Sequence, residues 1–141
     1  AAKELATRCL QESIQRDSAL ENPQDVYHYL THKLRPYPYE VFSCLFLDNA
    51  HRFIHFEELF HGSINEAAIY PRELIRQVYE HNAAAVILAH NHPSGIAEPS
   101  EADKRITQEI KSILSAIDVR LLDHIIIGEG AITSFASQGL L

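Results

Sequence analysis

Methionine is missing from this chain, and cysteine is scarce. The 141 residues contain no methionine and start at Ala1, so we expect a segment of a longer protein, and a further domain upstream stays open. The two cysteines, Cys9 and Cys44, form no CxxC pair, and Cys44 lies in the apolar run VFSCLFL. We therefore expect both thiols to be reduced and structural.

Long apolar runs and net positive charge are missing too. No stretch approaches the ~18 apolar residues that span a bilayer, and the N-terminal AAKELATR lacks the apolar core of a signal peptide. We therefore expect a soluble, cytoplasmic protein with no membrane partner. The formal net charge of -7 repels phosphate backbones, so direct nucleic-acid binding by this segment is not expected.

What is present suits one compact domain. At 46% hydrophobic residues, a chain of this length buries roughly two thirds of its unfolded surface and folds without disulfides or a structural metal. A bound metal would then be functional. There is no internal repeat, low-complexity segment or linker within the chain.

Apolar residues three and four positions apart predict two N-terminal helices, from Lys3 to about Arg16 and from Asp25 to about Leu34. The apolar face of the first would consist of Leu5, Ala6, Cys9, Leu10 and Ile14. The second would bury Val26, Tyr29 and Leu30. Pro36 and Pro38 end this helical region.

The remainder predicts alternating strands and helices. Strands are expected at residues 40–47, 52–59, 83–89, 121–127 and 131–135, with a short one near Ile64; helices are expected at 72–82 and 100–117. The first two strands would form a hairpin. This order of elements predicts an α/β protein in three layers, with helices packed on a central sheet.

A His-x-His motif follows the strand at 83–89. His90 and His92 leave the strand still extended, where alternate side chains share a face, so their imidazoles point the same way. Asp103 lies in the first turn of a helix capped by Ser100, and the loop 93–99 can fold that turn back against the histidines. Three nitrogen and oxygen ligands leave one position of a tetrahedral zinc ion open for water, which is the pattern of catalytic zinc.

Such a site also needs a carboxylate base near the metal but not bound to it. Zinc lowers the pKa of bound water from about 15.7 towards roughly 7 and polarises a neighbouring carbonyl. The candidate bases are Glu40, Glu57, Glu58 and Glu98. Glu40 opens an otherwise apolar strand, where burial would raise its pKa, but these residues alone do not rank it above the other three.

Plainer interpretations exist for each residue. A lone histidine is more often a surface or packing residue than a ligand, and Ser100 with Asp103 would also occur together simply as a helix N-cap and third residue. We interpret the other histidines as surface or packing residues: His28, His32, His51, His55, His61, His81 and His124.

The segment HNHPSGIAEPSEAD fits the pattern His-x-His-x7-Ser-x2-Asp and so resembles the JAMM (MPN) metallopeptidases. The flanking sequence, including YEVFSCLFLD, LLDHIIIG and SFASQGLL, resembles the bacterial RadC-like branch over about residues 37–141. The resemblance implies a cytidine-deaminase-like α/β/α fold with a central mixed sheet. A helical segment, residues 1–36, would then pack on a JAMM/MPN domain, residues 37–141.

By the same resemblance, His90, His92 and Asp103 bind Zn²⁺, Glu40 serves as the base, and Ser100 donates a hydrogen bond to the developing oxyanion. Because Ser100 also caps its helix, we expect its two roles to compete for one hydroxyl. The expected function is that of a zinc metalloprotease, which cleaves a peptide or isopeptide amide in a peptide or protein substrate by attack of metal-bound water.

Other functions stay open. RadC-like proteins carry a DNA-repair label and often a helix-hairpin-helix segment, but the first 36 residues contain no glycine on which such a phosphate-binding hairpin could be placed. The domain could instead be a DNA-repair or mobile-element accessory protein whose metal site is structural or vestigial. Nuclease activity is opposed by the -7 charge, and the deaminase signature H-x-E with P-C-x-x-C is absent. The sequence does not give the substrate or the metal, and it leaves a homo-oligomer open.

Overall fold

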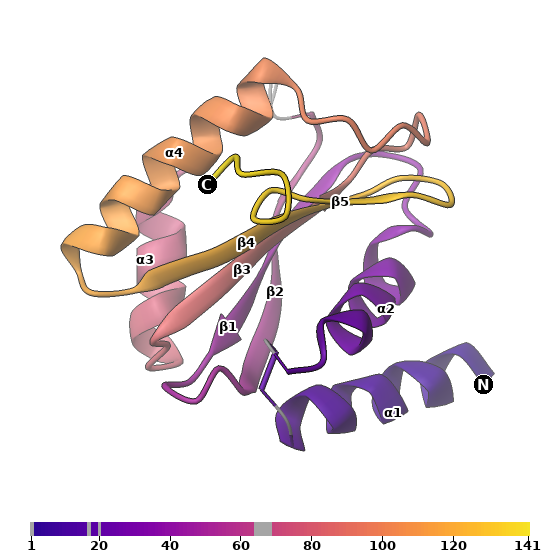
Figure 1. Cartoon of the computed structure of the whole chain (residues 1–141), viewed down its shortest axis with the longest axis horizontal. Helices are drawn as coiled ribbons and strands as arrows, with labels where there is room; N and C mark the ends of the chain where they lie inside the picture. The colour runs from indigo at the N-terminus through magenta and orange to yellow at the C-terminus, as the bar shows by residue number, and fades with distance from the viewer. Residues whose placement is uncertain (1, 17, 20, 64–68) are drawn as a thin grey trace.

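A five-stranded mixed sheet forms the middle layer of the protein (Figure 1). The computed structural model describes residues 2–16, 18–19, 21–63 and 69–141. The elements in these residues are α1 (Ala2–Arg16), α2 (Pro23–Leu34), β1 (Val41–Leu47), β2 (Phe53–His61), α3 (Pro71–Glu80), β3 (Ala85–Asn91), α4 (Glu101–Ala116), β4 (Arg120–Ile127) and β5 (Ile132–Ser134). The strand order is β2-β1-β3-β4-β5; β3 and β4 are parallel, and the other neighbouring pairs are antiparallel.

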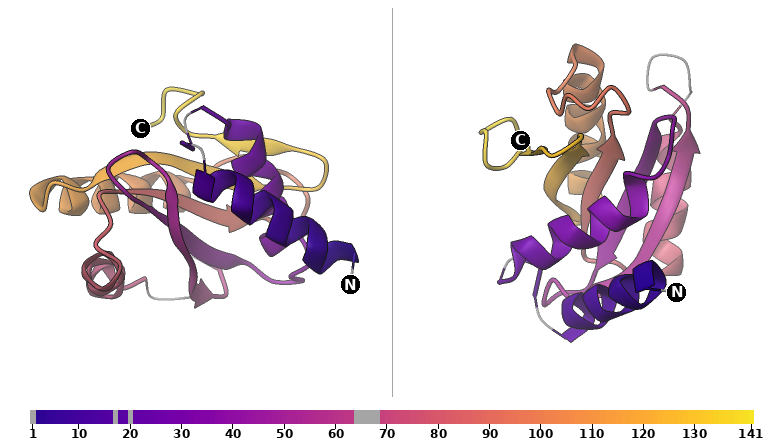
Figure 2. Two further views of the ribbon diagram at one scale, coloured as in Figure 1. Left: turned by 90° about the horizontal axis from the view of Figure 1, so that it is seen from below. Right: turned by 90° about the vertical axis from the view of Figure 1, so that its right-hand side faces the viewer.

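The two faces of the sheet carry separate halves of the core. All seven residues of β1 are buried, and alternate ones point to opposite faces, as in any strand. Val41 and Leu45 pack with α2 on one face, whereas Phe42 and Phe46 pack with α3 and α4 on the other. Figures 1 and 2 show α1 and α2 on one side of the sheet and α3 and α4 on the opposite side. This confirms the predicted three-layer α/β fold.

Most predicted elements are present, with shifted ends. The strand expected to stop at Ala89 continues through Asn91, so His90 belongs to β3 and not to a loop. The helix expected to reach Asn82 ends at Glu80, because Asn82 adopts a positive φ of 50°. The short strand predicted near Ile64 lies outside the described residues.

The predicted apolar face of α1 is wrong in part. Leu5 is 62% exposed, and Cys9 is exposed as well. The helix contacts α2 and β2 rather than the centre of the sheet, so part of its apolar stripe faces outward.

The prediction for α2 is confirmed, since Val26, Tyr29 and Leu30 are buried. No helix in the described ranges is long and apolar enough to cross a membrane.

A close backbone approach fixes the loop between β3 and α4. The His92 N–H donates to the Ile127 carbonyl, and the Glu129 N–H donates to the Gly95 carbonyl, each at 2.9 Å. A Cβ on Gly128 would lie 2.5 Å from that Gly95 oxygen. The loop therefore rests on the turn between β4 and β5 only because residue 128 has no side chain.

We predict that Gly128→Ala lowers the free energy of unfolding by about 1 to 3 kcal/mol, because the new methyl group must push the β3–α4 loop away. The ring signals of His92 in NMR spectra should shift with it. Gly130→Ala is the matched control: it has a positive φ of 70° but open space around it, so it should lower stability without moving the His92 signals. Unchanged His92 signals in Gly128→Ala would contradict this account.

Candidate metal centre

Three side chains from two segments meet at the carboxyl end of β3: His90 and His92 from the strand and its end, and Asp103 from α4. The Nε2 atom of His90 lies 3.3 Å from Asp103 Oδ1, and that of His92 lies 3.2 Å from Asp103 Oδ2. The two Nε2 atoms are 2.9 Å apart. Within the part of the chain that the structure describes, this is the one group of three such side chains placed to hold a metal ion, with ligand atoms within 4.8 Å of one another.

Local structure aims both imidazoles at Asp103. His90 lies on the α4 side of β3, the same side as Val86 and Leu88. His92 follows the strand, and its Nδ1 lies 2.9 Å from the Ile96 carbonyl oxygen. A carbonyl only accepts, so Nδ1 carries the hydrogen and Nε2 is the atom of His92 available to a metal.

Asp103 is held by the first turn of α4. Its Oδ2 accepts a hydrogen bond from the Ser100 N–H at 2.8 Å, and its own N–H donates to Ser100 Oγ at 3.0 Å, which completes a capping box. Ser100 Oγ acts as an acceptor in this cap, so its hydrogen remains able to donate elsewhere. The helix cap therefore does not compete with the predicted role of Ser100 as a hydrogen-bond donor to the oxyanion.

The charges in the site are coupled. Burial alone would raise the pKa of Asp103, but hydrogen bonds from His90 and His92 lower it below the ordinary value. The hydrogen bond to Asp103 raises the pKa of His92, while burial opposes that shift. A buried carboxylate beside two imidazoles is a negative centre that fits a divalent cation.

The donor set fits a metal such as zinc. Two imidazole nitrogens and one carboxylate oxygen are ligands that Zn²⁺ accepts, and three protein ligands leave a position for water or substrate. His90 and Asp103 are 1% and 2% exposed, which limits competition from bulk water on that side. The exposed Ser100 lies at the open side.

Glu40 approaches the three side chains from β1. Since β1 runs antiparallel to β3 with Phe42 opposite His90, the residue before β1 lies beside the end of β3. Glu40 Oε1 is 4.0 Å from His92 Nε2, and its side chain is 26% exposed. The Glu40 carboxylate thus lies next to one of the candidate ligand atoms.

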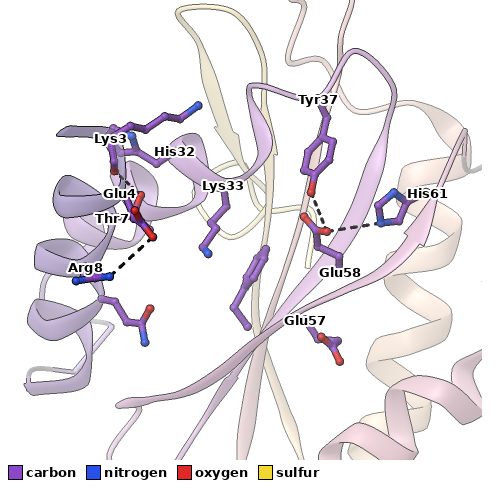
Figure 3. Close-up of a pocket in the computed structure, with 12 residues that line it drawn as sticks. Lys3, Glu4, Thr7, Arg8, His32, Lys33, Tyr37, Glu57, Glu58 and His61 are labelled. Carbon is purple, nitrogen blue, oxygen red and sulfur yellow. Dashed lines mark hydrogen bonds and ion pairs between the residues drawn. The ribbon is translucent and has the colours of Figure 1, made fainter. Parts of the chain in front are cut away.

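The other candidate acids have different partners. Glu58 accepts a hydrogen bond from the Tyr37 hydroxyl at 2.9 Å and lies 3.6 Å from His61 Nε2 (Figure 3). Glu57 accepts from Gln77 Nε2 at 3.3 Å, and Glu98 is exposed. The geometry thus favours Glu40 over the alternatives that the sequence left open.

Asn91, between the two histidines, holds the segment that carries Glu40. Its Oδ1 accepts from the Val41 N–H at 2.7 Å, and its Nδ2 donates to the carbonyl oxygens of Tyr39 at 2.9 Å and Tyr37 at 3.4 Å. Sequence reasoning missed this role. A polar residue that is only 2% exposed had to find partners, but the sequence did not show which ones.

His124 was also missed. We interpreted it as a surface or packing residue, and it does pack between Phe42 and Phe135, but its Nε2 also lies 2.8 Å from His90 Nδ1. The available signal was its position in β4, where Asp123 and His124 interrupt an apolar run. His28 and His61 are exposed, consistent with the surface interpretation.

Two cavities differ in their relation to this site. One of about 420 Å³ borders the metal centre and is lined by Arg35, Tyr37, Pro38, Asn91, His92, Pro93, Gly95, Ile127, Gly128 and Glu129. A larger one of about 860 Å³ lies between α1, α2 and β2 and contains Glu57 and Glu58 but none of the three candidate ligands (Figure 3).

Comparisons with known proteins agree on a family. The model of the RadC-like JAB domain matches residues 20–140. Over 141 residues, and thus all of this chain, it is 55% identical to a UPF0758 protein of Nitrosococcus oceani, covering 63% of that protein. It is 56% identical over 142 aligned residues to one of Stenotrophomonas maltophilia, covering 61%. The chain therefore spans less than two thirds of these relatives. The division into residues 1–36 and 37–141 stays a prediction.

We predict that Asn91→Ala exposes the Val41 amide to hydrogen exchange, since Asn91 Oδ1 is its acceptor, and lowers the free energy of unfolding by about 1 to 3 kcal/mol. Ser43→Ala is a matched control, because Ser43 Oγ donates to the Ala89 carbonyl on the same strand pair. It should lower stability and leave the Val41 amide protected. Mass spectrometry or NMR measures this exchange. A Val41 amide that stayed protected in Asn91→Ala would contradict the role of Asn91.

In the metal-free protein, we predict that His92 titrates above the ordinary histidine value and that Asp103→Asn brings its pKa down, because the hydrogen bond to Asp103 is the largest cause of the shift. A raised pKa means that protonated His92 stabilises the fold below its unfolded-state pKa, and that this contribution is lost as pH rises through the folded-state pKa. NMR titration measures both values. Glu101→Gln, in the same helical turn, should leave the pKa of His92 unchanged; a drop as large as in Asp103→Asn would refute the assignment.

Proposed function

Because this chain belongs to the family of RadC-like JAB domains, we propose that it is a zinc-dependent hydrolase of the metalloprotease type, which cleaves a peptide or isopeptide amide. The observation that carries the proposal is the convergence of His90, His92 and Asp103, with Glu40 Oε1 4.0 Å from one of them. JAB domains fall in the JAMM superfamily, which includes metalloproteases. The names of the relatives state no activity.

The ion and the chain supply different parts of this chemistry. When bound, zinc would lower the pKa of a coordinated water to about 7 and polarise the amide carbonyl. Glu40 would take a proton from the attacking water and deliver it to the nitrogen of the leaving amine. Its partly exposed carboxylate is placed at the rim of the site, where water and substrate both have access.

Ser100 would stabilise the oxyanion that develops on the attacked carbonyl. Its Oγ accepts the Asp103 N–H at 3.0 Å, which fixes the hydroxyl and leaves its hydrogen for the substrate. A preorganised donor of this kind typically contributes about 10²- to 10³-fold in rate. The helix cap therefore supports the catalytic role instead of opposing it.

A peptide or protein is the substrate class that we propose. The cavity of about 420 Å³ beside His92 has the size of a site for one or two side chains, and it offers Arg35, Tyr37 and Glu129 as polar contacts. We likewise propose that the protein is cytoplasmic and that the partner of the longer protein is this peptide or protein substrate. The net charge of -7 favours this substrate class over nucleic acid.

We expect wild-type protein prepared with excess Zn²⁺ to hold about one equivalent per chain, and His92→Ala to hold much less. Glu40→Gln should keep the metal but lose about 10²- to 10⁴-fold in the rate of amide cleavage. Glu57→Gln is the matched control on β2 and should leave both unchanged. Elemental analysis measures the bound zinc. Assays with a short-peptide library and ubiquitin-like fusions as substrates measure the rate of amide cleavage. Absence of zinc from the wild type under these conditions would sink the mechanism.

The accessory-protein hypothesis makes the opposite prediction. If the metal site is structural or vestigial, partner or DNA binding should survive the loss of the metal ligands in His90→Ala. Loss of that binding in a folded His90→Ala protein would count against the accessory hypothesis.

A further inference from the structure

A buried histidine connects two of the candidate metal ligands from behind. His124 is fully buried in β4, and its Nε2 lies 2.8 Å from Nδ1 of His90. Its other nitrogen, Nδ1, lies 2.5 Å from the hydroxyl oxygen of Thr107 on α4. Thr107 is itself fully buried and contacts the Asp103 carbonyl oxygen at 2.6 Å. The chain of contacts thus begins at one ligand and ends at the backbone of another.

The direction of each hydrogen bond in this chain of contacts follows from the Asp103 carbonyl oxygen at its end. The Asp103 carbonyl oxygen can only accept, so Thr107 donates its single hydroxyl hydrogen to it. Thr107 Oγ1 has no second hydrogen, so it must accept from His124 Nδ1. His124 therefore carries a hydrogen on Nδ1.

The state of His124 then sets that of His90. A charge on a fully buried imidazole is costly, so the ring of His124 is neutral, with its one hydrogen on Nδ1 and Nε2 bare. Phe42 and Phe135 pack against the ring and offer no polar partner to a charge. A bare His124 Nε2 accepts from His90 Nδ1–H, so Nε2 is the nitrogen of His90 that faces Asp103 and His92.

We propose that His124 and Thr107 are positioning residues that hold His90 as its Nδ1–H tautomer, so that Nε2 is always presented to the metal. The same contacts tie the ligand on β3 to the helix turn that carries Asp103. Outer partners of metal-binding histidines typically contribute 10- to 100-fold in metal affinity. The proposal rests on the metal-binding part of the proposed function and is independent of whether the site hydrolyses amides.

The first test needs no metal and no variant. Long-range ¹H–¹⁵N NMR spectra of the metal-free protein, at a pH where the imidazoles are neutral, distinguish protonated from bare ring nitrogens. We expect Nδ1–H on both His90 and His124. A spectrum in which Nδ1 of His90 carries no hydrogen would overturn the proposal.

The second test measures affinity for Zn²⁺ by competition with a chromophoric chelator. Thr107→Val removes the acceptor for His124 Nδ1–H at nearly constant volume; we expect Zn²⁺ affinity to fall by roughly 10-fold and His90 to acquire some Nε2–H form. Thr107→Ser keeps a hydroxyl and should restore both readouts towards wild type.

Thr31→Val is the matched control. Thr31 Oγ1 donates to the carbonyl of Tyr27, four residues earlier in α2, just as Thr107 does to Asp103 in α4. It should leave Zn²⁺ affinity unchanged. Wild-type affinity in a folded Thr107→Val protein, or an equal loss in Thr31→Val, would contradict the inference. A wild type that binds no Zn²⁺ would refute the metal site itself, and the tautomers of the metal-free protein would still decide this proposal.

Discussion

The pleat of β3 sends consecutive side chains to opposite faces of the sheet, and the site depends on that alternation. His90 turns towards α4, where Asp103 lies. Asn91 turns towards the α2 side, where it binds the backbone of residues 37–41. The proposed ligands come from the end of β3 and the start of α4, and the proposed base comes from the residue before β1, next to that end of β3. The antiparallel register of β1 against β3 makes this possible, since it brings the start of one strand to the end of the other.

The buried carboxylate of Asp103 is the main electrostatic feature. Removing a charge from water is costly unless hydrogen bonds and an opposite charge compensate it. Here the Ser100 N–H, two imidazoles and the N-terminus of α4 all face the group. Without a metal, the hydrogen bond to Asp103 raises the pKa of His92, and at a pH below that pKa a proton on His92 supplies part of the positive charge. The fold thus maintains a negative centre that a divalent cation would complete.

Much of the site could be predicted from the sequence because it is local. The His-x-His spacing on a strand and the Ser100–Asp103 cap each depend on a few neighbouring residues, and the structure has both as predicted. Glu40 could not be ranked first by such reasoning, because its distance to His92 depends on strand register. The roles of Asn91 and His124 depend on partners 17 to 54 residues away in sequence. The exposure of Leu5 likewise depends on where α1 packs and not on its periodicity.

Among the described residues, the side chain of Asn91 hydrogen-bonds to backbone atoms alone, those of Tyr37, Tyr39 and Val41. The position of Glu40 therefore does not depend on which side chains lie beside it in the sequence. Tyr39, which is 44% exposed, can be exchanged in the course of evolution without displacing the acid. Substitution of the exposed Tyr39 side chain can thus change the surface next to the site without moving the backbone that carries Glu40.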